Sequence, residues 1–147
     1  MQQITPLHQG ISVENMQESI SWYQEVLGCE VLSQEFVPFL NATIAFLKLG
    51  QFQLELFEYH GEDKKSVPED RKTPKDDLKT CGTKHVAYSI ENMKAFMAHA
   101  DVRKVDIALP VSRMSDDWVL FIRDNSGTLI ELIEVNGAIS NPNAFLS

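Results

Sequence analysis

HQGISVENM at positions 8–16 returns 77 residues later as HVAYSIENM at positions 85–93. A second phrase, LELFE at positions 54–58, returns 76 residues later as IELIE at positions 130–134. A repeat at a nearly constant offset indicates two copies of one structural unit. The sequence therefore predicts two similar modules within 147 residues, which is enough chain for two small modules that share a core.

Each copy carries one histidine near its start and one glutamate near its end. These residues are His8 and Glu55 in the first copy, and His85 and Glu131 in the second. The two histidine-to-glutamate separations, 47 and 46 residues, are nearly equal. Two imidazoles and two carboxylates suit borderline divalent cations such as Ni, Co, Zn, Fe or Mn. We therefore predict that pairing of the copies brings these four side chains together as the ligands of one divalent metal ion.

The periodicity of apolar residues gives the same element order in both copies, namely one strand, one helix and three strands. The predicted helices begin at the N-caps Asn15 and Asn92, and the first ends at Gly28. These elements predict an α+β fold of two βαβββ modules, at about 4–60 and 83–136. The predicted strands are 7–13, 29–36, 43–49, 52–59, 83–90, 104–109, 118–123 and 128–135, and the tail 136–147 is expected to be irregular.

The residues that share a strand face with each histidine are small, whereas the opposite face carries the bulk. A sheet turns its bulky side chains toward a packed helix, so the histidine face is predicted to be the open one. Glu55 and Glu131 stand in the middle of apolar strands, where a carboxylate is costly unless it is paired or bound to metal. Glu58 and Glu134 lie on the other strand face and are predicted to face solvent or the helix.

Residues 61–82 differ in character from both modules, with six acidic and six basic residues and two prolines. We predict that this charged loop joins the modules of a single domain. Two interpretations stay open, a solvated linker and a lid over the site, because long irregular segments in compact domains are often functional.

Composition excludes several classes of partner. The net charge of −8 and the pI near 4.9 argue against nucleic acid and anionic membranes, which both require a basic face. No apolar run approaches the length that spans a bilayer, and the N-terminus lacks the pattern of a signal peptide, so a cytoplasmic location is expected. Cys29 and Cys81 are too few and too far apart for a disulfide scaffold and are predicted to be reduced thiols.

The chain resembles the vicinal oxygen chelate superfamily, the glyoxalase and bleomycin-resistance fold. The resemblance implies that the two βαβββ modules form a partly open mixed-sheet barrel around the metal, and it implies a homodimer. The stretches that carry it are 8–16, 19–28, 54–58, 82–85 and 124–132, which together span nearly the whole chain.

Within this family, the metal ligands of glyoxalase I and methylmalonyl-CoA epimerase fall at the positions of His8, Glu55, His85 and Glu131. Glyoxalase I resembles this chain in having glutamate at the second position, where the epimerase typically has glutamine. The resemblance therefore implies a metal-dependent lyase or isomerase of the glyoxalase type. The alternatives are an epimerase, whose layout has a similarly long segment between Glu55 and His85, an extradiol-type dioxygenase, and a non-catalytic protein that binds small molecules such as antibiotics.

The expected chemistry is proton transfer on a small substrate that offers two neighbouring oxygens to the metal. Glu131 matches the metal-associated glutamate that moves the proton in glyoxalase I, and Glu55 is its counterpart in the other copy. Other side chains are candidates for binding the substrate, and for each a purely structural role is the alternative. Phe57, Tyr59 and Trp118 line the pocket or pack in the core, and Arg113 and Arg123 hold an anionic substrate tail or lie on the surface.

Overall fold

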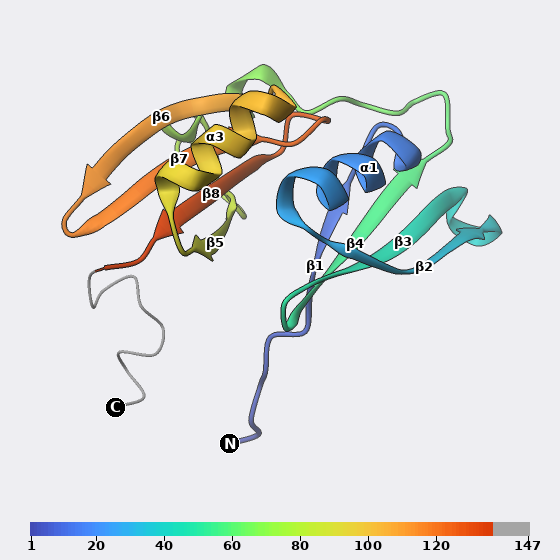
Figure 1. Cartoon of the computed structure of the whole chain (residues 1–147). Coiled ribbons are helices and arrows are strands. Elements are labelled where there is room, and N and C mark those ends of the chain that lie inside the picture. The colour runs from blue at the N-terminus through green and yellow to red at the C-terminus, as the bar shows by residue number, and fades with distance from the viewer. Residues whose placement is uncertain (137–147) are drawn as a thin grey trace. The chain divides into compact units, whose positions relative to one another are not determined.

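The computed structural model describes residues 1–136, so the predicted irregular tail beyond Asn136 lies outside the described residues. The chain divides after Ser66 into two compact units. We call residues 1–66 the first module and residues 67–136 the second module, and describe each by itself (Figure 1). Within residues 1–136, no helix is both long enough and apolar enough to cross a membrane.

The first module is a mixed four-stranded sheet with one long helix. The strands are arranged in the order β1-β4-β3-β2. The first and last strands, β1 and β4, pair in parallel, whereas the other pairs are antiparallel. The elements are β1 (His8–Ser12), α1 (Met16–Leu27), β2 (Glu30–Val37), the 3-10 turn η1 (Pro38–Leu40), β3 (Ala42–Leu49) and β4 (Phe52–Tyr59).

The second module repeats this topology. Its sheet has the order β5-β8-β7-β6, again with the first and last strands in parallel. An additional short stretch precedes it, made of the 3-10 turn η2 (Glu69–Arg71) and α2 (Pro74–Asp77). The prediction of an α+β chain with two βαβββ modules and mixed sheets is confirmed. The repeated elements are β5 (Val86–Ile90), α3 (Met93–Arg103), β6 (Asp106–Met114), β7 (Asp117–Arg123) and β8 (Leu129–Glu134).

Both long helices begin at the predicted asparagines. The Asn15 side chain accepts a hydrogen bond from the Glu18 amide at 3.0 Å, and the Asn92 side chain accepts one from the Ala95 amide at 2.8 Å. These bonds satisfy amides that have no partner inside a helix. Gly28 ends α1 in the left-handed conformation with a φ of 73°.

A carboxylate from the last strand of each module accepts a hydrogen bond from the first amide of the helix. Glu58 of β4 accepts a hydrogen bond from the Met16 amide at 2.9 Å, and Glu134 of β8 accepts one from the Met93 amide at 2.6 Å. A negative charge is stabilised at this end of a helix by the helix dipole. The second glutamate of each repeated phrase therefore fastens the helix to the sheet, which confirms that it faces the helix.

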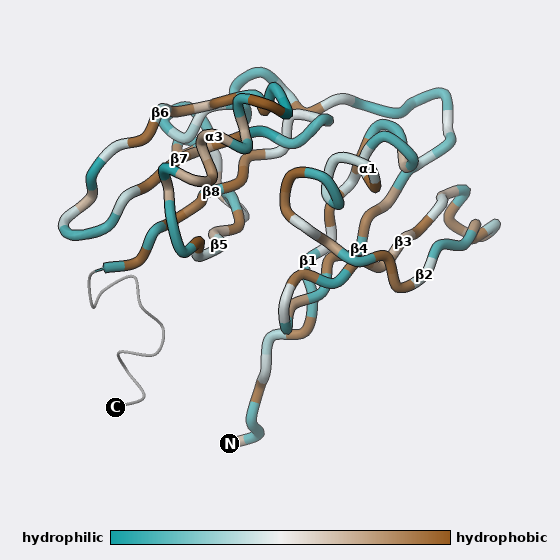
Figure 2. The backbone as a smooth tube through the Cα atoms, in the orientation of Figure 1, coloured by the Kyte–Doolittle hydropathy of each residue, from teal (hydrophilic) through white to brown (hydrophobic). Residues whose placement is uncertain are grey.

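The core of each module lies between the helix and one face of the sheet. Leu54 and Leu56 of β4 are fully buried on this face, and Ile130 and Leu132 hold the same positions in β8. Figure 2 shows mostly apolar strands that are interrupted by polar residues, and the buried leucines and isoleucines form the covered face of each sheet. The other face of each strand is thus left for Glu55 or Glu131.

One predicted strand is longer than expected. The pattern predicts a strand over 104–109 that stops before Pro110, but β6 runs on to Met114. Register shifts on both sides of Leu109 mark an irregular pairing with β7. Because β6 is an edge strand, it tolerates a proline that an inner strand would reject.

Candidate metal centre

The predicted ligands of the first module lie side by side on neighbouring strands. His8 and Glu55 belong to the parallel strands β1 and β4, in which Gly10 is the register partner of Glu55. The Nε2 atom of His8 lies 3.0 Å from Oε2 of Glu55. Both side chains are partly exposed, on the sheet face that the helix does not cover.

The second module reproduces this pair. The Nε2 atom of His85 lies 3.0 Å from Oε2 of Glu131, the distance found in the first module. Ala87 is the register partner of Glu131, as Gly10 is of Glu55. The parallel pairing of first and last strands is what brings residues about 46 positions apart into contact, so the repeat in sequence becomes a repeat in side-chain geometry.

An aromatic ring that the sequence analysis missed completes each pair. Phe46 is the β3 partner of Glu55 and meets the His8 ring edge to face, with centroids 5.7 Å apart. Phe121 is the β7 partner of Glu131 and meets the His85 ring in the same way at 4.9 Å. Such packing fixes the plane of the imidazole. The signal was present in the sequence, because Phe46 and Phe121 are also a repeat, at an offset of 75.

Small residues stand on the open face beside each histidine. Ser12, Ala87 and Ser89 are exposed on the same face as the histidine of their module. At Gly10, an added Cβ would stand 3.3 Å from the ring of Phe57, so a larger side chain would press on that ring. Small residues therefore leave room beside each pair for a ligand.

The pairs fit a divalent cation as two of its ligands. Two donors at right angles around a metal, with bonds of about 2.1 Å, lie about 3.0 Å apart. The observed distance between Nε2 and Oε2 is 3.0 Å in both modules. Imidazole and carboxylate are also the donors that borderline cations accept. Within residues 1–136, neither module adds a third histidine, cysteine, aspartate or glutamate to its pair, so each holds half of the predicted ligand set.

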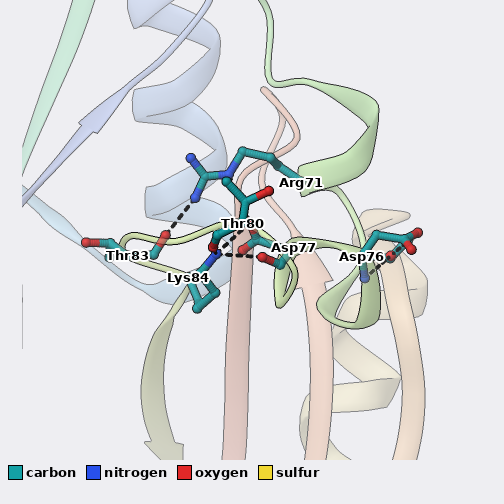
Figure 3. Close-up of polar contacts among 7 residues, drawn as sticks. Arg71, Asp76, Asp77, Thr80, Thr83 and Lys84 are labelled. Carbon is teal, nitrogen blue, oxygen red and sulfur yellow. Dashed lines mark hydrogen bonds and ion pairs between the residues drawn. The ribbon is translucent and has the colours of Figure 1, made fainter.

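Three charged residues, Arg71, Asp77 and Lys84, hold the chain just before His85, and we call them the brace (Figure 3). Asp77 is 1% exposed, and its carboxylate accepts a hydrogen bond from Arg71 at 2.9 Å and lies 3.3 Å from the Lys84 ammonium. Lys84 also donates to the main-chain carbonyls of Asp77 and Thr80, and Arg71 donates to that of Thr83 at 2.6 Å. The two residues before His85 are therefore tied to the loop 71–80 by their own polar groups.

Two opposing effects act on the Asp77 carboxyl. Burial by itself would raise its pKa, but the hydrogen bonds and positive charges of Arg71 and Lys84 together lower the pKa below its ordinary value of 3.8. Asp77 is therefore ionised at neutral pH. Residues 67–82 are thus more than a solvated linker, since they carry a buried ion pair of the second module; a lid function for this segment stays a prediction.

Most of the other candidates turn out to have structural partners. Tyr59 donates a hydrogen bond to Asp63 at 2.7 Å, and this carboxylate raises the tyrosine pKa. Arg123 donates to the Lys72 carbonyl at 2.7 Å and pairs with Asp106.

Trp118 is the β7 partner of Glu134 and so lies on the helix side of its sheet, away from Glu131. Arg113 stacks over its ring at 5.8 Å from the centroid. Of the pocket candidates, Phe57 and Tyr59 share the open face with a predicted ligand, Glu55, because alternate residues of β4 point the same way.

Comparison with known proteins identifies the family of the chain. The sequence profile of the Glyoxalase/Bleomycin resistance protein/Dioxygenase superfamily matches residues 5–132. The chain belongs to this superfamily. The match covers both modules and both His–Glu pairs, which confirms the resemblance drawn from the repeated phrases.

Members of the superfamily with related sequences and structures support the assignment. Mitochondrial methylmalonyl-CoA epimerase of Mus musculus is 24% identical over 129 residues, covering 85% of this chain and 70% of that protein. A glyoxalase family protein from Enterococcus faecalis superposes with a TM-score of 0.74 at 25% identity, over 88% of this chain and 97% of the other. The trypanothione-dependent glyoxalase I of Leishmania major gives a TM-score of 0.69 at 28% identity, over 90% and 87% of the two chains.

Proposed function

We propose that this chain is a metal-dependent lyase or isomerase of the glyoxalase type. One observation carries the proposal, namely that the same pair of potential ligands, 3.0 Å apart, stands on the open face of both modules. A single pair is a poor metal site, since catalytic sites usually supply three or more protein ligands. Joining the two pairs gives His8, Glu55, His85 and Glu131, with two positions of an octahedral ion left for substrate oxygens.

In this proposal the protein side chains move a proton. A divalent cation, when bound, polarises a substrate carbonyl and so makes the neighbouring C–H more acidic. The carboxylate of Glu131 removes that proton and returns it to an adjacent or opposite position, which yields an isomer or epimer. Glu55 stands in the equivalent place of the first module and shares the role of base. Phe46 and Phe121 hold the imidazole planes of their modules, so that the lone pair of Nε2 keeps its direction.

The two pairs can be joined in two ways. The modules of one chain can face each other, or the first module of one copy can face the second module of another in a homodimer. A closed dimer of this second kind has two equivalent sites, each built from both chains. The proposal holds in either case, because the ligand set is the same.

Metal content and turnover test the proposal together. Protein purified without added metal is analysed for Ni, Zn, Co, Mn and Fe, and is then assayed with the hemithioacetal of methylglyoxal and glutathione. We expect one bound ion per chain and isomerisation that stops when a chelator removes the ion. His60→Ala serves as a control, because His60 is bonded to Thr43 outside the repeat. A chain that binds none of these ions after reconstitution contradicts the proposal.

An epimerase is the second candidate, and the similarity to the mouse methylmalonyl-CoA epimerase favours it. It would use the same four side chains and the same proton transfer, on a carbon between a carbonyl and a carboxylate. Incubation with methylmalonyl-CoA in deuterated water distinguishes the two. Exchange of the proton on that carbon, without isomerisation of the hemithioacetal, would favour the epimerase.

A further inference from the structure

The second module contains a pocket that is open to solvent, which we call the cavity and which the proposed reaction does not use. Its volume is about 460 Å³, within the range of small-molecule sites. It lies on the helix side of the sheet, between α3 and the strands β6 to β8, whereas His85 and Glu131 belong to the opposite face. Its walls are Met93, Met97, Val111 and Trp118, with Lys94 and Glu134 among the polar residues.

In the first module, a hydrogen bond spans the corresponding place. There, Gln17 of α1 donates a hydrogen bond to Gln34 of β2 at 3.3 Å, which ties the helix to the edge strand. The repeat puts Lys94 at the position of Gln17. Val111 stands at the position of Gln34. Gln34 comes one residue before Glu35, which pairs with Ile44 of β3. Val111 comes one residue before Ser112, which pairs with Val119 of β7, the equivalent of Ile44. A lysine and a valine cannot form this bond, so the second module lacks this link between its helix and its edge strand at the place where the cavity lies.

The wall of the cavity also changes in character between the modules. Trp118 replaces Thr43, which holds the equivalent place opposite Glu58, and Met97 replaces Ile20. Trp118 is 39% exposed, which is high for so large an aromatic residue. Indole and thioether groups pack well against aromatic ligands, and methionine adapts its shape to them.

The charged residues at the cavity favour a ligand with a negative charge. Within residues 1–136, Lys94 is the one basic residue of the wall, and the Arg113 guanidinium, which pairs with Asp116 at 3.6 Å, lies over the ring of Trp118. Glu134 is the acidic residue of the wall, and its carboxylate is already bonded to the Met93 amide. We propose that this cavity binds an aromatic monocarboxylate, with the ring against Trp118 and Met97 and the carboxylate at Lys94.

Binding of 2-naphthoate to the full chain tests this site, with 2-naphthamide as its neutral analogue. Methionine methyl groups labelled with ¹³C report the location. We expect 2-naphthoate to shift the Met93 and Met97 signals and to leave unchanged that of Met16, the equivalent of Met93 in the first module. Shifts at Met16 instead, or no shifts at millimolar 2-naphthoate, would overturn the proposal.

Two variants separate charge from shape. Lys94→Gln should weaken 2-naphthoate by about tenfold, the size of one charged hydrogen bond, without changing the affinity for 2-naphthamide. Lys94→Gln combined with Val111→Gln installs the glutamine pair of the first module and should abolish binding of both compounds. Equal binding of 2-naphthoate by the wild type and the double variant would overturn the proposal. Gln17→Ala, which opens the corresponding bond in the first module, is the control and should leave the affinity unchanged.

Discussion

The two modules present the same pair of side chains, but within residues 1–136 the residues that precede the histidine are held by ion pairs in the second module only. In both, a histidine and a glutamate stand 3.0 Å apart beside a phenylalanine ring. In the second module, Arg71, Asp77 and Lys84 tie down the chain before the histidine. In the first module, the residues before His8 form no regular structure. Duplication has thus kept the chemical groups equal while their surroundings diverged.

The glutamates offer the sharpest test of whether the modules are also unequal in catalysis. Glutamine keeps the shape of the side chain but cannot accept a proton as a base. We expect Glu131→Gln to lower kcat by about 10²–10⁴-fold, the usual contribution of a general base. Glu55→Gln should lower kcat less, and both variants should retain metal. Steady-state assays with metal analysis measure this, and a fully active Glu131→Gln variant would refute the assignment.

Loss of either histidine should weaken metal binding, but by different amounts. His8→Ala keeps His85, whose preceding residues are held by Arg71, Asp77 and Lys84. His85→Ala keeps only His8, which has no such support in the described part of the chain. We expect both to lose more than the roughly 10–100-fold typical of outer-shell changes, with the larger loss in His85→Ala. Titration with cobalt, followed by absorbance, gives the two affinities. Equal losses would mean that the brace does not influence the metal.

Mixing these two variants shows how the modules pair. In a dimer whose sites combine modules from both chains, a mixed dimer has one site with both histidines intact. About a quarter of the wild-type metal binding should then return, since half of the dimers are mixed and each regains one of two sites. If the modules of one chain face each other, mixing restores nothing.

The brace itself can be removed with a matched pair of variants. Asp77→Asn leaves the partly exposed Arg71 and Lys84 without their buried partner and should lower the free energy of unfolding by about 1–3 kcal/mol. Asp76→Asn alters the neighbouring carboxylate, which accepts hydrogen bonds from Thr73 and Lys79 near the surface, and should lower the unfolding midpoint less. Urea denaturation of both variants measures the difference, and equal midpoints would show that the buried pair adds no stability.

The stability difference between wild type and Asp77→Asn should also depend on pH. The pKa of Asp77 is lower in the folded protein than its ordinary value of 3.8. The carboxylate therefore contributes fully above that value, and the contribution is lost as the pH falls through the lower, folded-state pKa. Denaturation at a series of pH values should show a constant gap at neutral pH that narrows below about pH 4. A gap that widens on acidification would contradict this.

The smallest expected effect concerns the glutamates that fasten the helices. Glu58→Gln and Glu134→Gln keep a hydrogen-bond acceptor but remove the charge at the helix start. Each should lower the free energy of unfolding by about 0.5–1 kcal/mol at low salt, and less at high salt. Glu134→Gln should have the larger effect, because its bond to the helix amide is shorter, 2.6 against 2.9 Å. The same denaturation curves, recorded at two salt concentrations, test both points.

Most of the fold followed from local patterns in the sequence. Asn15, Asn92 and Gly28 mark helix ends because capping chemistry is local, and alternation revealed which strand face each glutamate occupies. The pairs of histidine and glutamate could be predicted because the repeat tied two distant positions to one topology. What was missed depends on contacts across strands. The strand past Pro110 relies on its place at the sheet edge, which no local pattern reveals.

The brace could not be predicted from local sequence patterns either. The six acids and six bases of residues 61–82 look alike in sequence, and burial alone distinguishes Asp77 from Asp76. Phe46 and Phe121 were missed for a different reason. They are ordinary strand residues, and their role is visible only once β3 and β7 are aligned against the glutamates.

The parallel pairing of first and last strands has a consequence for protein synthesis. Because His8 and Glu55 come from opposite ends of their module, neither has its neighbour until β4 has docked against β1. The pair therefore requires the two ends of its module to come together, and all of its residues are synthesised before those of the second pair. In the proposed four-ligand site, a nascent chain that has reached the end of β4 would supply only His8 and Glu55, and the other two ligands would follow with residues 85–131.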